Sequence, residues 1–438
     1  MQICICSVKR KEILWAGFDK LEDEGDVIRR VLLLGCERNF LAFESNGSIA
    51  WKLHLAYTCN ASLPPVHGSR GKIFLVAENR VLNINFLDLE TSLPTKEVFF
   101  GQEDAGEIIG LAVSRLSSSV FINHRNQGLF VYLIGGQGQL LWSIGPMTSQ
   151  FGYRLGCRKD VTDCYFNSVP VIAQCEGSIY ISNTAGELYS LSIRSPHFNW
   201  IQDLSSFDKD FTVTPGNNAH LYVTVPIKAL VLALDVSTGN ILWQKSIGPL
   251  NAAALVPVVD SKGWVSIGSL DGFLYSISPT GDVKKFAKAS VLNHVIQVSP
   301  LLDCSGYAVY ISQAEMEGKF SRVIGEYNYV SALRPKGAVF TLLVPATRGE
   351  KTKDSRTQEQ MNRGRVYNQR GFTNAVIRDI DLHDDSNWVV ISSSMGANHL
   401  FAINPFGGSV NFQTSDASHT SKNSGLGVMM KSPVLLTT

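Results

Sequence analysis

The chain lacks long hydrophobic runs, has few cysteines and carries almost no net charge. Its longest stretches free of charged and turn residues, such as residues 229–234, fall far short of the roughly 20 apolar residues that cross a bilayer, so we predict no transmembrane segment. Lys+Arg number 39 against 38 Asp+Glu, and a net charge of +1 provides no field that attracts nucleic acid. The 8 cysteines form no CxxC pair, which excludes a zinc ribbon and a dithiol redox motif.

The amino-terminal residues also lack the pattern of a leader sequence. Lys9, Arg10, Lys11 and Glu12 interrupt residues 1–17, where a signal peptide would need an unbroken apolar core. From this chain alone we therefore expect neither a signal peptide nor a membrane anchor.

What the sequence does contain is an internal repeat. Its clearest copies are residues 41–51, 130–142 and 231–243, each an alternating strand, a turn containing glycine and a second strand that ends on tryptophan. Weaker copies cover 188–200, 274–286, 330–340 and 400–412, and residues 81–99 form a copy that has lost the turn glycine. The repeat predicts a chain built from many similar β units.

A second pair of strands precedes most copies of this repeat. Residues 169–173 precede 177–182, residues 255–259 precede 263–268, and a Ser-Pro-apolar segment at 299–302 precedes 306–311. Each unit therefore holds four strands. Between Trp51 and Phe412 the units repeat on average every 52 residues or so, about the period of propeller blades. We predict an all-β fold, a single β-propeller of eight four-stranded blades, with seven as the alternative.

The predicted domain boundaries follow from this repeat. Residues 1–27 form an irregular amino-terminal segment, and residues 28–438 form the propeller. Polar insertions interrupt the period at 151–166 and at 348–371, the second rich in lysine and arginine. Because residues 431–438 repeat the Ser-Pro-apolar pattern that the first unit lacks, we expect this carboxy-terminal strand to complete the first blade.

Several side chains have predicted structural roles. The repeated tryptophans, Trp51, Trp142, Trp200 and Trp243, are expected to pack between neighbouring blades rather than to stack on a ligand. In the first insertion, Cys157 and Cys164 are spaced to close a small disulfide ring, although two unpaired thiols are an equally good interpretation. Two glycosylation sequons begin at Asn46 and Asn60, and such tripeptides also occur by chance.

The strand that leads into Thr238-Gly239-Asn240-Ile241-Leu242-Trp243 resembles the repeats of quinoprotein alcohol dehydrogenase propellers. More narrowly, residues 39–51 and 166–243 resemble the Gamete Expressed 3 family of plants. That resemblance implies a plasma-membrane protein with an outward-facing propeller that acts in pollen-tube guidance and early embryo development. The two sequons and the pair Cys157 and Cys164 agree with an outward-facing location.

Nothing in the sequence predicts catalysis. Quinone-dependent enzymes of this fold cover the cofactor with a disulfide between adjacent cysteines, and no two cysteines here are adjacent. The 9 histidines form no HExxH motif, and there is no Gly-x-Ser-x-Gly elbow. We therefore predict a monomeric, non-catalytic recognition domain without cofactor or metal, which binds a protein or a glycan; a quinone-dependent oxidoreductase and an intracellular scaffold are the alternatives.

Overall fold

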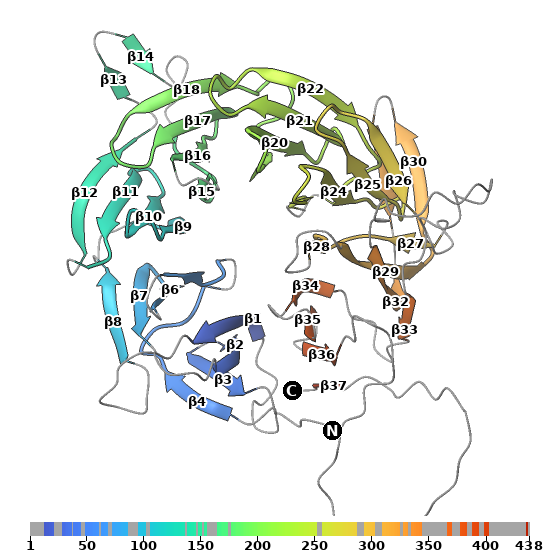
Figure 1. Ribbon diagram of the computed structural model, residues 1–438, viewed down its shortest axis with the longest axis horizontal. Helices are drawn as coiled ribbons and strands as arrows, with labels where there is room; N and C mark the ends of the chain where they lie inside the picture. The colour runs from blue at the N-terminus through green and yellow to red at the C-terminus, as the bar shows by residue number, and fades with distance from the viewer. Residues whose placement is uncertain are drawn as a thin grey trace, which may run out of the picture.

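A computed structural model of the chain shows antiparallel sheets placed around a common axis (Figure 1). It describes residues 13–21, 29–36, 38–44, 49–60, 63–68, 72–85, 95–101, 106–135, 138–145, 148–150, 153–155, 164–173, 177–251, 256–286, 293–302, 309–324, 327–331, 334–343, 366–369, 377–382, 388–393, 398–402 and 435–436. Within these residues, seven sheets have four strands and one has five. The prediction of an all-β propeller with four-stranded units is confirmed. The number of blades stays a prediction.

The strands of the first three sheets follow one another along the chain. The first sheet contains β1 (Ile13–Leu21), β2 (Arg29–Cys36), β3 (Asn39–Glu44) and β4 (Ile49–His54). The second contains β5 (Val66–His67), β6 (Lys72–Ala77), β7 (Arg80–Asn85) and β8 (Thr95–Phe100). The third contains β9 (Ile108–Ser114), β10 (Ser119–His124), β11 (Gly128–Leu133) and β12 (Gln139–Ile144). Each sheet is thus a meander of consecutive antiparallel strands.

The next three sheets repeat the same plan. The fourth holds β15 (Val171–Ile172), β16 (Ser178–Ser182), β17 (Glu187–Ser192) and β18 (Phe198–Asp203). The fifth holds β19 (Thr212–Pro215), β20 (His220–Val225), β21 (Leu230–Asp235) and β22 (Ile241–Ser246). The sixth holds β23 (Val258–Val259), β24 (Val265–Gly268), β25 (Leu274–Ile277) and β26 (Val283–Phe286).

The seventh sheet departs from the predicted repeat. It joins β27 (His294–Val295), β28 (Leu301–Leu302), β29 (Val309–Glu317), β32 (Arg334–Leu343) and β33 (Val366–Gln369). The expected hairpin over 330–340 is wrong, because β31 (Tyr327–Ser331) pairs with β30 (Phe320–Ile324) in a hairpin of its own, while β32 pairs with β29. The insertion predicted at 348–371 is not a loop throughout, since it contains β33.

The chain ends also require corrections. The segment 1–27 is not irregular throughout, since β1 lies within it and pairs with β2. The carboxy-terminal strand β37 (Leu435–Leu436) does not complete the first sheet. Instead it pairs with β36 (Asn398–Ala402) in the last sheet, beside β34 (Ile377–Leu382) and β35 (Trp388–Ser393). The first sheet does not need this strand, because β1 already supplies its fourth.

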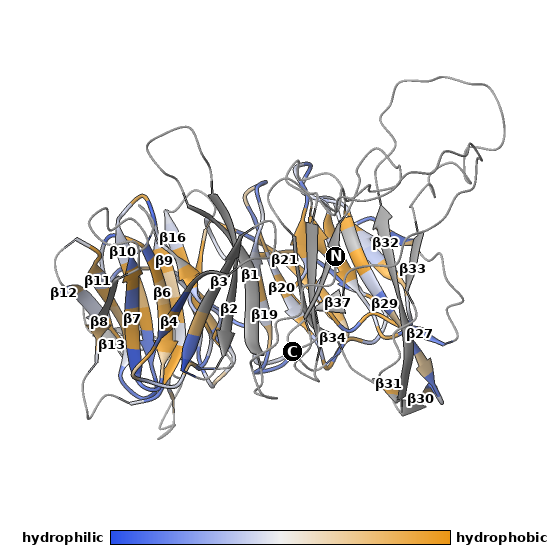
Figure 2. Cartoon of the chain, turned by 90° about the horizontal axis from the view of Figure 1, so that it is seen from below, coloured by the Kyte–Doolittle hydropathy of each residue, from blue (hydrophilic) through white to orange (hydrophobic). Residues whose placement is uncertain are grey.

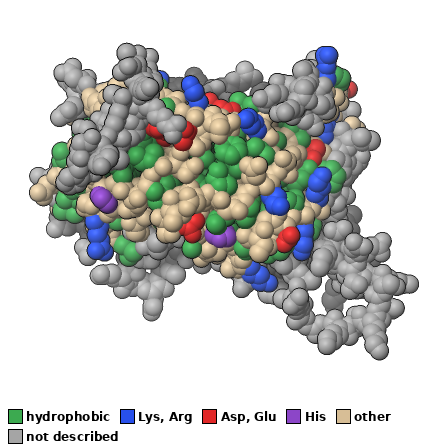
Figure 3. Space-filling model, turned by 90° about the horizontal axis from the view of Figure 1, so that it is seen from above, with side chains coloured by type: hydrophobic (Ala, Val, Ile, Leu, Met, Phe, Trp, Pro, Cys, Tyr) green, Lys and Arg blue, Asp and Glu red, His purple; other side chains and the backbone are tan. Residues whose placement is uncertain are grey.

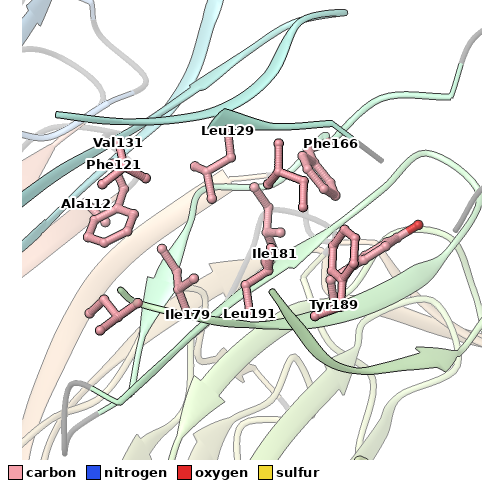
Figure 4. Close-up of a cluster of buried hydrophobic side chains, with 12 residues drawn as sticks. Ala112, Phe121, Leu129, Val131, Phe166, Ile179, Ile181, Tyr189 and Leu191 are labelled. Carbon is pink, nitrogen blue, oxygen red and sulfur yellow. The ribbon is translucent and has the colours of Figure 1, made fainter. Parts of the chain in front are cut away.

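Hydrophobic residues are concentrated in the strands, with the turns at both edges of the disc more hydrophilic (Figure 2). Each sheet buries its faces against its neighbours. Between the third and fourth sheets, for example, Phe121 and Val131 meet Ile179 and Leu191 in one interdigitated layer (Figure 4). Similar layers join the other described neighbours from the first sheet to the seventh. The core is therefore a series of seams between sheets.

One irregularity recurs in five of the outer strands. In β4, β8, β12, β18 and β22 the register with the preceding strand shifts by one residue, just before the aromatic position of the repeat. A β-bulge bends an edge strand and makes it a poorer template for a further strand. The bulge in each of these outer strands therefore disfavours the pairing of a further strand at the sheet edge.

Candidate functional site

Two of the predicted tryptophans are fixed in the seams by hydrogen bonds. The indole N–H of Trp200, on β18, donates to the carbonyl oxygen of Val236 in the next sheet at 2.8 Å. The indole of Trp243, on β22, donates to the carbonyl of Pro279 in the sheet after that, at 2.9 Å. Both rings also pack against buried apolar side chains of the neighbouring sheet. These contacts are structural and leave neither ring as a platform for a ligand.

The other two tryptophans differ. Trp142 packs against the core of the third seam, with its ring centroid 6.2 Å from that of Phe121. Among the described residues its buried indole nitrogen has no hydrogen-bond partner. Trp51 lies on β4 opposite Ala42, and its side chain is outside the described residues.

The predicted disulfide and sequons are only partly within the described residues. Cys164 is disulfide-bonded, while Cys157 lies outside them, so the pairing of the two stays a prediction. Asn46 also lies outside, and Asn60 is half-buried with its backbone N–H donating to Val76 O at 2.9 Å. Part of the insertion 151–166 forms a hairpin with the preceding residues, in which β13 (Thr148–Gln150) pairs with β14 (Tyr153–Leu155).

No metal centre is found in the part of the chain that the structure describes, where no three His, Cys, Asp or Glu side chains come together. Two arginines, one half-buried and one exposed, are stacked on tyrosines. They lie on one side of the disc, where the second and third strands of a sheet are connected and where the chain enters the next sheet.

The first of these clusters belongs to the third sheet. Arg125, in the β10–β11 turn, donates to the Glu107 carboxylate at 2.6 Å and to the Tyr165 hydroxyl at 3.0 Å. Its guanidinium carbon lies 5.3 Å from the centroid of the Tyr165 ring. The side chains of Arg125 and Glu107 are 49% and 59% exposed, so this arrangement faces solvent.

A second cluster of the same composition belongs to the second sheet. Arg80, at the start of β7, lies with its guanidinium carbon 4.4 Å from the centre of the Tyr57 ring. Glu78 in the preceding turn is 3.7 Å from Arg80 and also accepts a hydrogen bond from the Thr58 N–H at 3.2 Å. An arginine stacked on a tyrosine, with a glutamate beside it, therefore occurs on two neighbouring sheets, although the three residues come from different positions of the repeat.

Residues next to one pair of aromatic rings, Phe100 and His124, link the two clusters. Gly101 lies directly against the Arg80 side chain, and the neighbouring Phe100 ring is 4.9 Å from that of His124, which precedes Arg125. We call the six residues Tyr57, Glu78, Arg80, Glu107, Arg125 and Tyr165 the arginine–tyrosine surface.

A buried polar network fixes the far end of this surface. Tyr165 is anchored to the fourth sheet, where the Thr184 N–H donates to its carbonyl oxygen at 3.0 Å. Below it, Asn183 donates to the buried carboxylate of Glu187 at 2.8 Å, and the Tyr189 hydroxyl donates to the same carboxylate at 2.8 Å. The surface thus stands on rigid strands and turns, which suits a preformed binding site.

Sequence reasoning did not find the arginine–tyrosine surface. Arg125 and Tyr165 are 40 residues apart, so no local motif links them. The one available signal is an arginine in or beside the turn between the second and third strands of two successive units.

The rim of the disc is a second exposed region. On the face that carries β18 and β22, hydrophobic side chains gather between scattered charged ones (Figure 3). Ile241 and Leu242 of β22 are partly exposed, with 37% and 47% of their surface accessible. Single apolar side chains at a surface are common, so we do not assign a function to the rim.

The chain is similar in fold to solved structures and in sequence to one family model. A computationally designed protein named Ika8 aligns over 92% of this chain and 99% of its own, with a TM-score of 0.56 at 11% identity. BamB from Moraxella catarrhalis aligns over 66% of this chain and 77% of its own, with a TM-score of 0.43 at 13% identity. Residues 366–425 match the family model described as BCAS3, WD40 repeat. The repeated four-stranded sheets and the match to this repeat model show a β-propeller repeat protein.

Among curated proteins, the chain is 51% identical over 349 residues to Protein GAMETE EXPRESSED 3 of Arabidopsis thaliana. The match covers 76% of this chain and 54% of that protein, so the chain spans about half the length of its relative. Autophagy-related protein 18f of Arabidopsis thaliana is 65% identical over 37 residues, which are 8% of this chain and 5% of that protein. The resemblance to the Gamete Expressed 3 family is confirmed, and the chain is a relative of that protein.

The described part of the chain contains no apolar helix of membrane-spanning length.

Proposed function

We propose that this propeller is a non-catalytic recognition domain that binds a protein through the arginine–tyrosine surface. The observation that carries the proposal is the repetition of a stacked arginine, a tyrosine and a glutamate on two neighbouring sheets. Exposed salt bridges contribute about 0–1 kcal/mol to folding, so stability gives little reason to build two of them. Arginine and tyrosine are, in contrast, enriched among the residues that dominate binding energy at protein interfaces.

The relationship to GAMETE EXPRESSED 3 supports a more specific role. We propose a plasma-membrane-associated protein of plant reproduction whose propeller faces outward and acts in pollen-tube guidance and early embryo development. The disulfide at Cys164 supports an outward-facing location, because disulfides persist in oxidising compartments.

The binding proposal is tested by combining Arg80→Ala with Arg125→Ala. A photo-reactive amino acid placed at Gln127, exposed in the β10–β11 turn, would cross-link partners in extracts of reproductive tissue. We expect a defined partner to be captured by the unsubstituted surface and lost in the double variant. The matched control is Lys228→Ala with Lys262→Ala, two cations outside the surface, which should leave capture unchanged. Equal capture by the double variant would show that this surface is not the binding site.

Catalysis is tested separately. Purified protein supplied with pyrroloquinoline quinone and calcium should show neither saturable quinone binding nor dye-linked alcohol oxidation, since no two cysteines are adjacent to cover the quinone. Turnover that depends on the quinone would overturn the non-catalytic assignment.

A further inference from the structure

A buried histidine lies directly beneath the arginine–tyrosine surface. His124 is the last residue of β10 and is fully buried. Its ring centroid is 4.9 Å from that of Phe100 and 5.4 Å from that of Phe130. An imidazole enclosed by two aromatic rings has little access to water, which a charged imidazolium would need.

The hydrogen bonding of His124 is suited to the neutral ring. Its Nδ1 lies 3.4 Å from the carbonyl oxygen of Gly106, a contact that assigns the proton to Nδ1. The Nε2 atom is buried without a hydrogen-bond partner among the described residues. Protonation would put an N–H at Nε2, and that buried donor would face no acceptor there. Burial accordingly lowers the pKa of His124 below its ordinary value, and the bond to Gly106 opposes this effect only in part.

The residue pairs Gly106–Glu107 and His124–Arg125 connect the buried imidazole to the exposed cluster. Gly106, which accepts from the imidazole, is followed by Glu107, whose carboxylate binds the Arg125 side chain. The carbonyl of Glu107 also accepts the backbone N–H of Arg125 at 2.9 Å. Movement of the imidazole would therefore displace the pairing of Glu107 with Arg125.

Few charged or titratable groups approach the imidazole from the packed elements. Arg125 follows it in the turn, and Glu107 precedes β9; these two already neutralise each other at 2.6 Å. From the β11 side, Tyr132 packs on Phe100 with ring centroids 5.2 Å apart, and burial raises its pKa to about 12, so that it stays neutral. Tyr165 and Arg80 belong to the surface above. Among the described residues none of these groups lies in place to accept from a protonated Nε2.

We propose that His124 is a pH switch for the arginine–tyrosine surface, which is assembled while this imidazole is neutral and is loosened when the imidazole is protonated. The biological consequence rests on the function proposed above, whereas the switch itself is a property of the fold. Because the folded state disfavours the proton, mildly acidic pH, below the ordinary pKa of histidine near 6.5, should open the turn.

Hydrogen exchange tests the switch without a binding partner. The Arg125 amide, bonded to Glu107, is followed at about pH 7.5 and about pH 5, with rates corrected for the intrinsic effect of pH. We expect its corrected exchange to accelerate by about tenfold or more at the lower pH, while amides of β20 and β21 keep their protection. Equal protection of Arg125 at both values would overturn the proposal.

Variants assign the effect to this residue. His124→Phe should remove the acceleration, because an aromatic ring without nitrogen remains between Phe100 and Phe130. His197→Gln, at an exposed histidine of the fourth sheet, is the control and should behave as the unsubstituted protein. An acceleration that persists in His124→Phe would assign the switch to another group and overturn it.

A carbon-13 NMR titration of labelled histidine in the unsubstituted protein covers the case in which the phenylalanine variant fails to fold. The Cε1 shift of His124 should titrate below the ordinary histidine value of 6.5 and at the pH at which Arg125 loses protection; a mismatch would contradict the proposal. The binding proposal is assessed separately, at neutral pH, with Arg80→Ala and Arg125→Ala. A failure of the binding proposal would leave the hydrogen-exchange result unaffected, so the two outcomes can be distinguished.

Discussion

The indole nitrogen of Trp243 donates to the carbonyl oxygen of Pro279 across a seam between sheets, and Trp200 makes the same bond to Val236 one sheet earlier. In both pairs donor and acceptor are separated by 36 residues, so the contact is a repeating element of the fold. The contributions of the ring and of the hydrogen bond to the free energy of unfolding can be measured separately.

Trp243→Phe should cost about 1 kcal/mol of unfolding free energy, since it removes one hydrogen bond and keeps most of the apolar surface. Trp243→Ala should cost about 2–4 kcal/mol, somewhat less than a fully buried aromatic, because the ring is partly exposed. Urea unfolding of both variants measures the difference. A Trp243→Ala protein as stable as the unsubstituted one would exclude a role in the seam.

Gly239 makes the close approach of Trp200 possible. Its φ angle is +75°, and a β-carbon at this position would lie 2.6 Å from the Trp200 ring. Gly239→Ala should therefore destabilise the protein by at least about 1 kcal/mol, through both backbone strain and displacement of the indole. Gly135→Ala is the matched control, because a β-carbon there meets nothing within 4 Å. Thermal unfolding should separate the two variants, and equal melting temperatures would contradict this account of the turn.

The sequence predicts these glycine turns because they are local. Thr238-Gly239 fixes a strand–turn–strand pattern within a few residues, and β21 and β22 lie on either side of this turn. Pairings between distant segments are harder to predict from the sequence. Nothing local shows that Leu435 pairs with β36 rather than with the first sheet, or that Arg125 meets Tyr165, because tertiary packing decides both.

Thr224 offers a test of an unpaired polar group in the core. It is fully buried on β20, opposite Thr212, and among the described residues the hydroxyl oxygens of both lack a hydrogen-bond partner. Thr224→Val keeps the shape and removes the buried hydroxyl, so it should leave stability unchanged or raise it by up to about 1 kcal/mol. Thr224→Ser keeps the hydroxyl and removes a methyl group, so it should destabilise by about 1 kcal/mol. Chemical denaturation that ranks serine above valine would show that the hydroxyl is satisfied.

The turn acid Asp235 gives a pH dependence of the same sign as that of His124, but in a lower pH range. The carboxylate of Asp235 accepts from the hydroxyl of Ser237 and from the backbone N–H and hydroxyl of Thr238 at 2.9 and 3.0 Å, and these bonds lower its pKa. A group whose pKa is lower in the folded state stabilises the fold above its unfolded pKa of 3.8 and loses that contribution as the pH falls through the folded value. Asp235→Asn should therefore flatten part of the stability loss below about pH 4, whereas His124→Phe should flatten the loss that begins near pH 6.5. Unfolding free energies measured from pH 3 to pH 8 would distinguish the two. If Asp235→Asn changed the slope near pH 6.5 instead, the assignment of these two pH ranges would be wrong.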